Sequence, residues 1–184
     1  MRYFPLFYDS KDKKLLIIGG GAVALQKLEA LQLFEFNITL IASKINNEVQ
    51  KLCKKMGYKI YERDFMVEDL HGFDIVIAAT DSRDIHKFIK EQVYKDVLLN
   101  TVDSPEFCDF IFGSMVEKNG VLIALSSQGK APSVVKALKE RMSEAVPDNL
   151  PKLIDKIAKV RQKMPAGEER MKKIKKLTKK WFNK

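Results

Sequence analysis

The sequence predicts an α/β protein in which a doubly wound parallel sheet is followed by a β-hairpin and several helices. Up to about residue 105, short runs rich in leucine and β-branched residues alternate with segments of helical periodicity, which is typical of parallel strands joined by helices. Beyond that point the alternation stops, and an Asn-Gly pair between two extended runs indicates a hairpin. We therefore expect a sheet domain first and a different architecture after it.

Short apolar runs in the first part are the expected parallel strands. The first run ends at Gly19, as a buried strand does before a tight turn. The runs are Leu15–Ile18, Asn37–Ala42, Tyr58–Tyr61, Asp74–Ala79 and Val97–Val102. The expected helices between them are Ala22–Phe34, Asn46–Met56 and Arg83–Tyr94. The first helix carries Ala24, Leu28 and Leu31 on one face, and Gly57 is the expected stop of the second.

The second part of the chain is expected to begin with a hairpin formed by Phe110–Val116 and Val121–Ser126. Pro132 then favours the start of a helix over Ser133–Ala145. A break at Val146–Pro151 precedes two amphipathic helices, which Pro165–Gly167 separates. The apolar positions of these helices are Leu153, Ile154, Ile157, Val160 and Met164, and then Met171, Ile174, Leu177 and Trp181. These breaks, near 105–112 and 146–151, predict domains at 1–108, 109–147 and 148–184.

The charge of the chain is concentrated in its last segment. Residues 150–184 contain 13 Lys or Arg and 3 Asp or Glu, so the net charge of +9 belongs to this segment and the remainder is nearly neutral. We expect its apolar face to pack on the protein or a partner subunit, and its lysines to face water or attract an anionic substrate. Nucleic-acid binding is the third alternative, and without a recognised motif or interleaved aromatic residues we expect no nucleic-acid partner.

Other bulk features predict a cytoplasmic protein with no membrane partner. No apolar run approaches the ~20 residues of a membrane span, and the N-terminus does not resemble a secretory signal. The two cysteines, Cys53 and Cys108, suit a reducing compartment. The two histidines, His71 and His86, have no neighbours at metal-ligand spacing, so we expect both to be surface or hydrogen-bonded residues and expect no metal site.

The glycine-rich turn after the first strand predicts dinucleotide binding. Gly19-x-Gly21-x-x-Ala24 matches the G-x-G-x-x-G/A fingerprint, with a strand before it and a helix after it. The helix N-terminus would offer free N–H groups to a pyrophosphate. The expected cofactor contacts are Gly19, Gly20, Gly21, Ala22, Val23 and Ala24. The alternative is an ordinary turn between a strand and a helix.

The second strand ends without the acidic residue that usually binds the ribose of NAD. Ala42-Ser43-Lys44 stands there instead, so Ser43 is the expected ribose contact, and Lys44 would meet a 2′-phosphate or simply face water. NAD is the expected cofactor, with NADP left open. Thr80 and Asp81 follow the fourth strand and are further expected cofactor contacts, although Asp81 would equally suit a helix N-cap.

Three motifs together resemble the precorrin-2 dehydrogenase family, which includes the dehydrogenase–ferrochelatase part of sirohaem synthases. They are Gly19-Gly-Gly21-x-Val23-Ala24, Ala78-Ala-Thr-Asp81, and Asn100-Thr-Val-Asp103-Ser-Pro105-Glu106-Phe-Cys108-Asp109-Phe110. The resemblance extends from about Phe4 to Pro147. It implies a Rossmann domain, a small dimerisation region and a helical C-terminal module in a homodimer.

The same resemblance implies an activity and a catalytic residue. The activity is NAD-dependent oxidation of precorrin-2 to sirohydrochlorin, and the family's essential aspartate corresponds to Asp103. That carboxylate would accept a proton or stabilise developing charge; its alternative role is to cap the turn before Pro105. Asn100 and Lys130 are expected to bind the substrate. Ala131 departs from the family, because many members have a serine there that is phosphorylated in some.

Three alternatives to a single dehydrogenase activity remain. The chain would also insert ferrous or cobaltous ion if it is bifunctional, or it would sense a nucleotide without catalysis and dock through its basic tail. A dehydrogenase for an unrelated small substrate is the third. Given the chain length, we expect no fused methyltransferase domain.

Near Asp103, we expect Cys108 to be a packed thiol and Glu106 a turn or interface residue.

Overall fold

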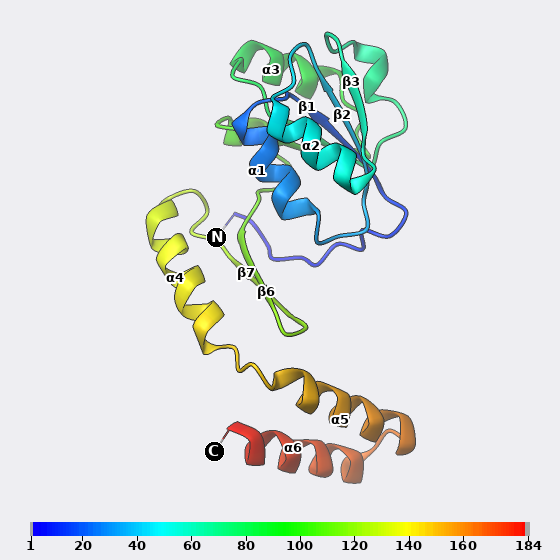
Figure 1. The fold of residues 1–184 in the computed structure, drawn as a ribbon, viewed down its shortest axis with the longest axis vertical. Coiled ribbons are helices and arrows are strands. Elements are labelled where there is room, and N and C mark those ends of the chain that lie inside the picture. Colours follow the sequence, from blue (N-terminus) through cyan, green and yellow to red (C-terminus); the bar gives the residue numbers. More distant parts are fainter. Residues whose placement is uncertain (1, 183–184) are drawn as a thin grey trace. The chain divides into compact units, whose positions relative to one another are not determined.

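A computed structural model describes residues 2–182 of the chain (Figure 1). Met1, Asn183 and Lys184, at the ends of the first and third expected domains, lie outside the described residues. The chain divides into two compact units, Met1–Phe112 and Gly113–Lys184. Each unit has its own hydrophobic core and is described separately.

The first unit contains the parallel sheet that the sequence predicts. Its strands are β1 (Lys14–Ile18), β2 (Asn37–Ala42), β3 (Lys59–Glu62), β4 (Ile75–Ala78) and β5 (Leu98–Thr101). The spatial order is β3-β2-β1-β4-β5, and every neighbouring pair is parallel (Figure 1). The chain therefore moves outward from β1 to β3 and then returns to the other side of β1. In such sheets ligands bind where this reversal occurs, beyond the carboxyl ends of the strands.

Helices cover both faces of the sheet, as expected for a Rossmann-type fold. These helices are α1 (Ala22–Leu31), α2 (Asn47–Met56) and α3 (Arg83–Gln92), with short 3₁₀ turns η1 (Val67–Leu70) and η2 (Pro105–Phe107). Alternate residues of β1 point to opposite faces: Leu15 and Ile17 join a core with α1 and α2, whereas Leu16 and Ile18 join a core with α3. Because both faces are buried there, β4 and all of β1 after Lys14 are apolar, whereas the edge strand β3 is exposed and carries charged residues.

Several element boundaries differ from those expected. Helix α1 ends at Leu31 rather than Phe34, and α3 ends at Gln92 rather than Tyr94. The third strand begins at Lys59, because the Tyr58 N–H bonds to the Cys53 carbonyl and completes the end of α2. The segment expected to be extended from Phe110 is a strand only from Ser114, since Phe110 and Phe112 pack against the core of the first unit.

The second unit consists of a hairpin and three helices. Strands β6 (Ser114–Lys118) and β7 (Val121–Leu125) are antiparallel. Asn119 and Gly120 both have positive φ, 55° and 77°, which is the two-residue hairpin turn that Asn-Gly favours. Helix α4 (Pro132–Ala145) begins at the proline, and α5 (Leu150–Lys163) and α6 (Glu168–Phe182) follow. Leu150 and Leu153 of α5 share a core with the hairpin and with Leu177 and Trp181 of α6.

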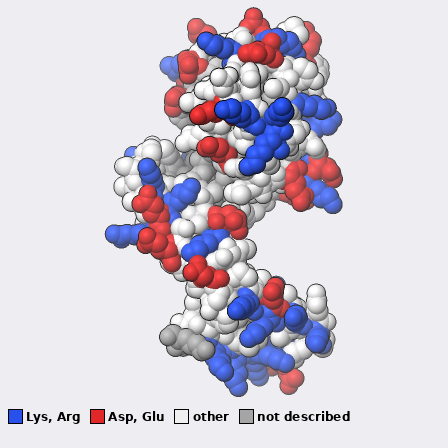
Figure 2. Space-filling model, viewed as in Figure 1, with Lys and Arg blue, Asp and Glu red and all other residues white. Residues whose placement is uncertain are grey.

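Most of the basic side chains of the second unit belong to α5 and α6, where Figure 2 shows many of them at the surface. Lysines of α6 such as Lys172 and Lys176 are exposed, whereas Leu177 and Trp181 of this helix pack against the core of the unit. Across residues 2–182, no helix combines the length and apolar character needed to cross a membrane.

Candidate functional site

The carboxyl edge of the sheet brings together most of the residues that the sequence singled out. Gly19–Gly21 follow strand β1, Ser43 follows β2, Thr80 follows β4 and Asp103 follows β5. Because these strands are parallel, the segments that follow them lie along the same edge. Lys130 belongs to the second unit, where it is exposed in the turn before α4.

The first two glycines of the turn are required by packing. A Cβ on Gly19 would overlap the carbonyl oxygen of Ala79 and lie 2.8 Å from its carbonyl carbon, and its φ of +125° favours glycine. A Cβ on Gly20 would overlap the Lys44 carbonyl oxygen and lie 2.9 Å from Ile45 Cα. These glycines let the turn approach the segments after β4 and β2.

Gly21 is different, because the space beside it is open. Apart from the adjoining chain, no heavy atom of residues 2–182 lies within 4 Å of the position that its Cβ would occupy, and the residue is exposed. It is the N-cap of α1, with no side-chain capping bond and no acidic residue in the first turn. The first N–H groups of the helix thus have no intrahelical partners and carry the positive end of the dipole. Ala24 is fully buried, so the helix packs closely on the sheet. These features fit a pyrophosphate at this N-terminus.

The ends of β2 and β4 offer further polar groups. Ser43 and Lys44 are exposed, and Thr80 Oγ1 is buried without a hydrogen-bond partner among residues 2–182. The N-cap of α3 is Ser82, whose hydroxyl accepts from the Ile85 N–H at 3.3 Å. The alternative role of Asp81 as the helix cap is therefore wrong, and its side chain is exposed beside the turn.

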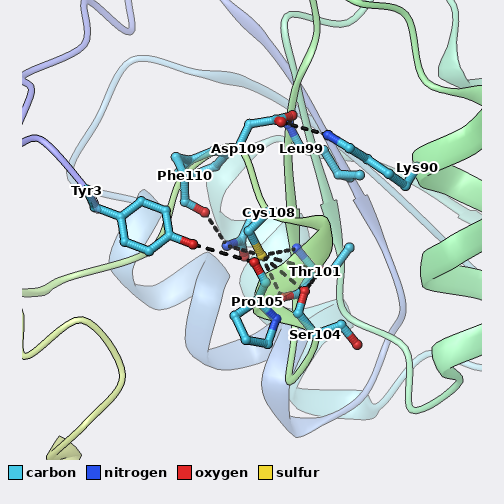
Figure 3. Close-up of polar contacts among 10 residues, drawn as sticks. Tyr3, Lys90, Leu99, Thr101, Ser104, Pro105, Cys108, Asp109 and Phe110 are labelled. Carbon is cyan, nitrogen blue, oxygen red and sulfur yellow. Dashed lines mark hydrogen bonds and ion pairs between the residues drawn. The ribbon is translucent and has the colours of Figure 1, made fainter. Parts of the chain in front are cut away.

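Asp103 lies in a tight turn between β5 and η2. Its side chain is exposed, and its φ of 57° places it in the left-handed region, which aspartate adopts more readily than most residues. The next residue, Ser104, is buried, and its carbonyl accepts from the Thr101 hydroxyl at 2.6 Å (Figure 3). Within the described chain the Asp103 carboxylate makes no hydrogen bond, so the turn-capping alternative has no bond to support it.

The chain after this turn is bonded back to β5. The Asp109 N–H donates to the Leu99 carbonyl at 2.8 Å, and the Leu99 N–H donates to Asp109 Oδ2 at 3.0 Å (Figure 3). Lys90 Nζ lies 2.6 Å from Asp109 Oδ1. The Cys108 thiol is buried against Thr101, as expected for a packed cysteine. These contacts fix the segment that carries Asp103.

Asn100 belongs to the same bonded segment and does not reach an open surface. It is 5% exposed, and its side-chain amide donates to the Phe110 carbonyl at 2.9 Å. This burial corrects the expectation of direct contact with substrate, because the amide is already used to hold the returning chain. Glu106, in contrast, forms an exposed ion pair with Arg83 of α3 at 2.7 Å.

Lys27 is a half-buried side chain near Asp103 that the sequence reasoning missed. Its Nζ lies 4.3 Å from the centroid of the Phe112 ring. Burial lowers the pKa of Lys27, and the nearby Cys108 and Asp103 side chains oppose that shift. Lys27 is three residues after Ala24, so helical spacing placed it beside the buried face.

His86 is the second residue that was missed. Only 2% of it is exposed, its Nδ1 lies 3.0 Å from Ser104 Oγ, and its Nε2 has no hydrogen-bond partner in residues 2–182. Burial lowers the pKa of His86. For His86, the expectation of a surface or hydrogen-bonded histidine is met only through the contact of Nδ1 with Ser104. It is confirmed for the exposed His71, whose ring contacts the Tyr94 hydroxyl at 3.0 Å. The spacing of His86 with Ile89 and Val93 was the available signal, because it places all three on one helix face.

Comparison with known proteins identifies similar sequences and a similar structure. A family model described as putative NAD(P)-binding matches residues 6–114. Siroheme synthase of Psychrobacter arcticus is 35% identical over 154 residues, and that of Blochmanniella pennsylvanica 36% over 151. These matches cover 83% and 82% of this chain, but the chain spans only 28% and 31% of those relatives. The solved structure of "SirC, precorrin-2 dehydrogenase" has a TM-score of 0.81 at 18% identity, covering 95% of this chain and 89% of that one, and so shares the fold.

Proposed function

Since the chain belongs to the putative NAD(P)-binding family, we propose that it is an NAD-dependent dehydrogenase that oxidises precorrin-2 to sirohydrochlorin in sirohaem biosynthesis. The names of its relatives and of the protein that shares its fold support this substrate. The observation that carries the proposal is that an open helix N-terminus at Gly21 and an exposed carboxylate at Asp103 follow strands of the same sheet edge.

The residues around the glycine turn would hold the cofactor. The N–H groups of residues 21–24 would bind the pyrophosphate, because they lie at the positive end of α1 and the space beside Gly21 is open. Ser43 would bond a ribose hydroxyl at the end of β2, and Thr80 and Asp81 would line the site at the end of β4. When bound, NAD supplies the acceptor for a hydride from the substrate.

Asp103 would receive the proton that the reaction releases. Oxidation of precorrin-2 removes two hydrogens, one as a hydride and one as a proton from the macrocycle. An exposed carboxylate on a well-held turn can accept that proton without first breaking a bond of its own. The same carboxylate would stabilise positive charge on the ring nitrogens.

Cationic groups of the second unit would bind the carboxylates of the substrate. Lys130 is exposed, and α4 has no acidic residue in its first turn. We further propose that residues 109–147 form a dimerisation region and 148–184 a basic helical module, in a homodimer. The exposed Val134 and Leu138 on α4 are consistent with a covered apolar surface.

The proposal is tested by incubating the protein with precorrin-2 and NAD and recording the spectra of sirohydrochlorin and NADH. Asp103→Asn should reduce kcat by about 10²–10⁴-fold, the range typical of a lost acid–base group, while NAD binding is unchanged. The control is Asp96→Asn, an exposed carboxylate before the opposite end of β5. Absence of NAD reduction by the wild-type protein would reject the proposal.

A second arm of the same assay adds ferrous iron as a substrate. Formation of sirohaem faster than the spontaneous reaction would identify a bifunctional enzyme, and sirohydrochlorin alone would identify a dehydrogenase. Residues 2–182 contain no group of three or more side chains arranged to bind a metal. Any chelation would therefore depend on Asp103 and the macrocycle itself, and Asp103→Asn should remove both activities.

A further inference from the structure

We infer that His86 is a positioning residue for Asp103, holding the turn that presents the Asp103 carboxylate through a hydrogen bond to Ser104. The inference rests on the proposed function, in which Asp103 receives the proton. It assigns a role in the reaction to a side chain that makes no contact with the reacting atoms.

The His86–Ser104 bond links two elements of the first unit. His86 lies on α3, which follows β4, and Ser104 lies in the turn after β5. The two groups are 3.0 Å apart, and only 2% and 3% of the residues are exposed. A buried bond of this kind is shielded from competing water, so it constrains the position of the turn.

Ser104 is held on its main-chain side as well. Its carbonyl accepts from the Thr101 hydroxyl at 2.6 Å (Figure 3) and from the Phe107 N–H at 3.1 Å. His86 is the group that fixes the Ser104 side chain. Together these bonds immobilise the residue that immediately follows Asp103.

Asp103 needs such support because of its backbone conformation. At a φ of 57° a residue with a Cβ is less stable than in the common regions, and it persists there only when its surroundings hold it. The neighbouring bonds from Ser104 to His86 and Thr101 provide that restraint. Without the imidazole, the turn would relax and the carboxylate would sample other directions.

A neutral imidazole suits this position. The carboxylates near it are those of Asp81, before α3, and of Asp103 and Glu106, in the turn after β5. The nearby Thr80 main chain and these carboxylates favour the charged ring, but the effect of burial, which favours the uncharged ring, is larger. Nδ1 lies at hydrogen-bond distance from the Ser104 hydroxyl, and the tautomer of the neutral ring decides which of the two groups donates.

The test compares His86→Ala, His86→Asn and Ser104→Ala in the precorrin-2 assay. The alanine variants should each lose about tenfold or more in kcat, while KM for NAD changes by less than about twofold, because the pyrophosphate site is untouched. Asparagine places an oxygen close to the position of Nδ1 and should recover most of the lost rate. The matched control is His71→Ala, which removes the other histidine of the chain.

Two further comparisons separate positioning from a general structural effect. The double variant His86→Ala/Ser104→Ala should be no slower than either single variant, because both remove the same bond. In an Asp103→Asn background, His86→Ala should have no further effect on kcat. An additive loss in either comparison would overturn the inference.

Hydrogen exchange of residues 101–108 provides a readout that does not depend on the reaction. It should be faster in His86→Ala and Ser104→Ala than in the wild type, and unchanged in His71→Ala. If His86→Ala does not fold, the Ser104→Ala variant tests the same hydrogen bond by removing a single hydroxyl. Wild-type protein that leaves precorrin-2 unchanged would reject the proposed function, whereas an active wild type with unaffected His86 variants or unchanged exchange would reject only the role of His86.

Discussion

Replacing Gly21 by alanine should weaken NAD binding and leave the fold intact, whereas replacing Gly20 by alanine should destabilise the fold. The two residues are adjacent in the sequence but have opposite surroundings. A Cβ on Gly20 would meet the main chain at Lys44 and Ile45, and a Cβ on Gly21 would enter open space. The pair therefore separates a glycine needed for packing from one needed for a ligand.

The expected stability effects follow from those surroundings. Main chain cannot move aside as a flexible side chain does, so Gly20→Ala should cost about 1–3 kcal/mol, as overpacking usually does. In a protein of this size that corresponds to a decrease in Tm of about 2–12 °C. For Gly21→Ala, an N-cap residue with normal backbone angles, we expect a change within about 0.5 kcal/mol.

The expected effect on binding is the reverse. The second glycine of the fingerprint lets the pyrophosphate approach the backbone, and a methyl group there would hold the ligand away from the N–H groups of α1. We expect Gly21→Ala to raise the Kd for NAD about 10–100-fold, or about 1.4–2.8 kcal/mol. Thermal unfolding measures the change in stability of each variant, and calorimetric titration with NAD measures the change in Kd.

Two results would refute this reasoning. If Gly21→Ala binds NAD as tightly as the wild type, the N-terminus of α1 is not the pyrophosphate site. If Gly21→Ala loses as much stability as Gly20→Ala, the space beside Gly21 is not open.

Three further predictions concern the residues around the site. Ser43→Asp should lower the affinity for NADP relative to NAD by about tenfold or more, because a carboxylate at the end of β2 repels a 2′-phosphate; equal changes in the two Kd values would contradict it. The lowered pKa of His86 means that below its ordinary pKa of about 6.5 the unfolded chain binds a proton that the folded chain does not. Wild-type Tm should therefore fall as the pH decreases through that range, and the Tm of His86→Asn should fall less. An equal fall in the Tm of both proteins would contradict this prediction. Asp109→Ala leaves the Leu99 N–H without its side-chain acceptor and should lower the free energy of unfolding by about 1–3 kcal/mol. A denaturant titration measures this change, and an unchanged midpoint would contradict the prediction.

The parts of the site that depend on local backbone chemistry could be predicted from the sequence. The glycine turn, the Asn-Gly hairpin and the stop at Gly57 all follow from conformations that few other residues adopt, and the structure contains each of them. The alternation of apolar runs and helical segments also predicted the parallel sheet, because burial on both faces requires that pattern.

The sequence could not assign polar side chains whose partners are distant in the chain. Asp81 and Ser82 are equally suitable caps by residue type, and only the path of the chain after β4 selects Ser82. Asn100 was expected to face a substrate, but the chain returning along β5 buries it against Phe110. The sequence alone does not show which residues surround Asn100 in the folded protein.

The sequence by itself determined the fold class and the position of the glycine-rich turn, because short-range sterics and hydrophobic periodicity specify these features. The role proposed for Asp103 came instead from the resemblance of the segment around it to a known family. Tertiary structure alone decided which glycine faces open space, and it brought the buried His86 and the half-buried Lys27 near Asp103. The physical reason is that desolvation and hydrogen bonding act through space. The environment of a side chain is set by segments that the sheet order brings together, and sequence spacing does not report that order.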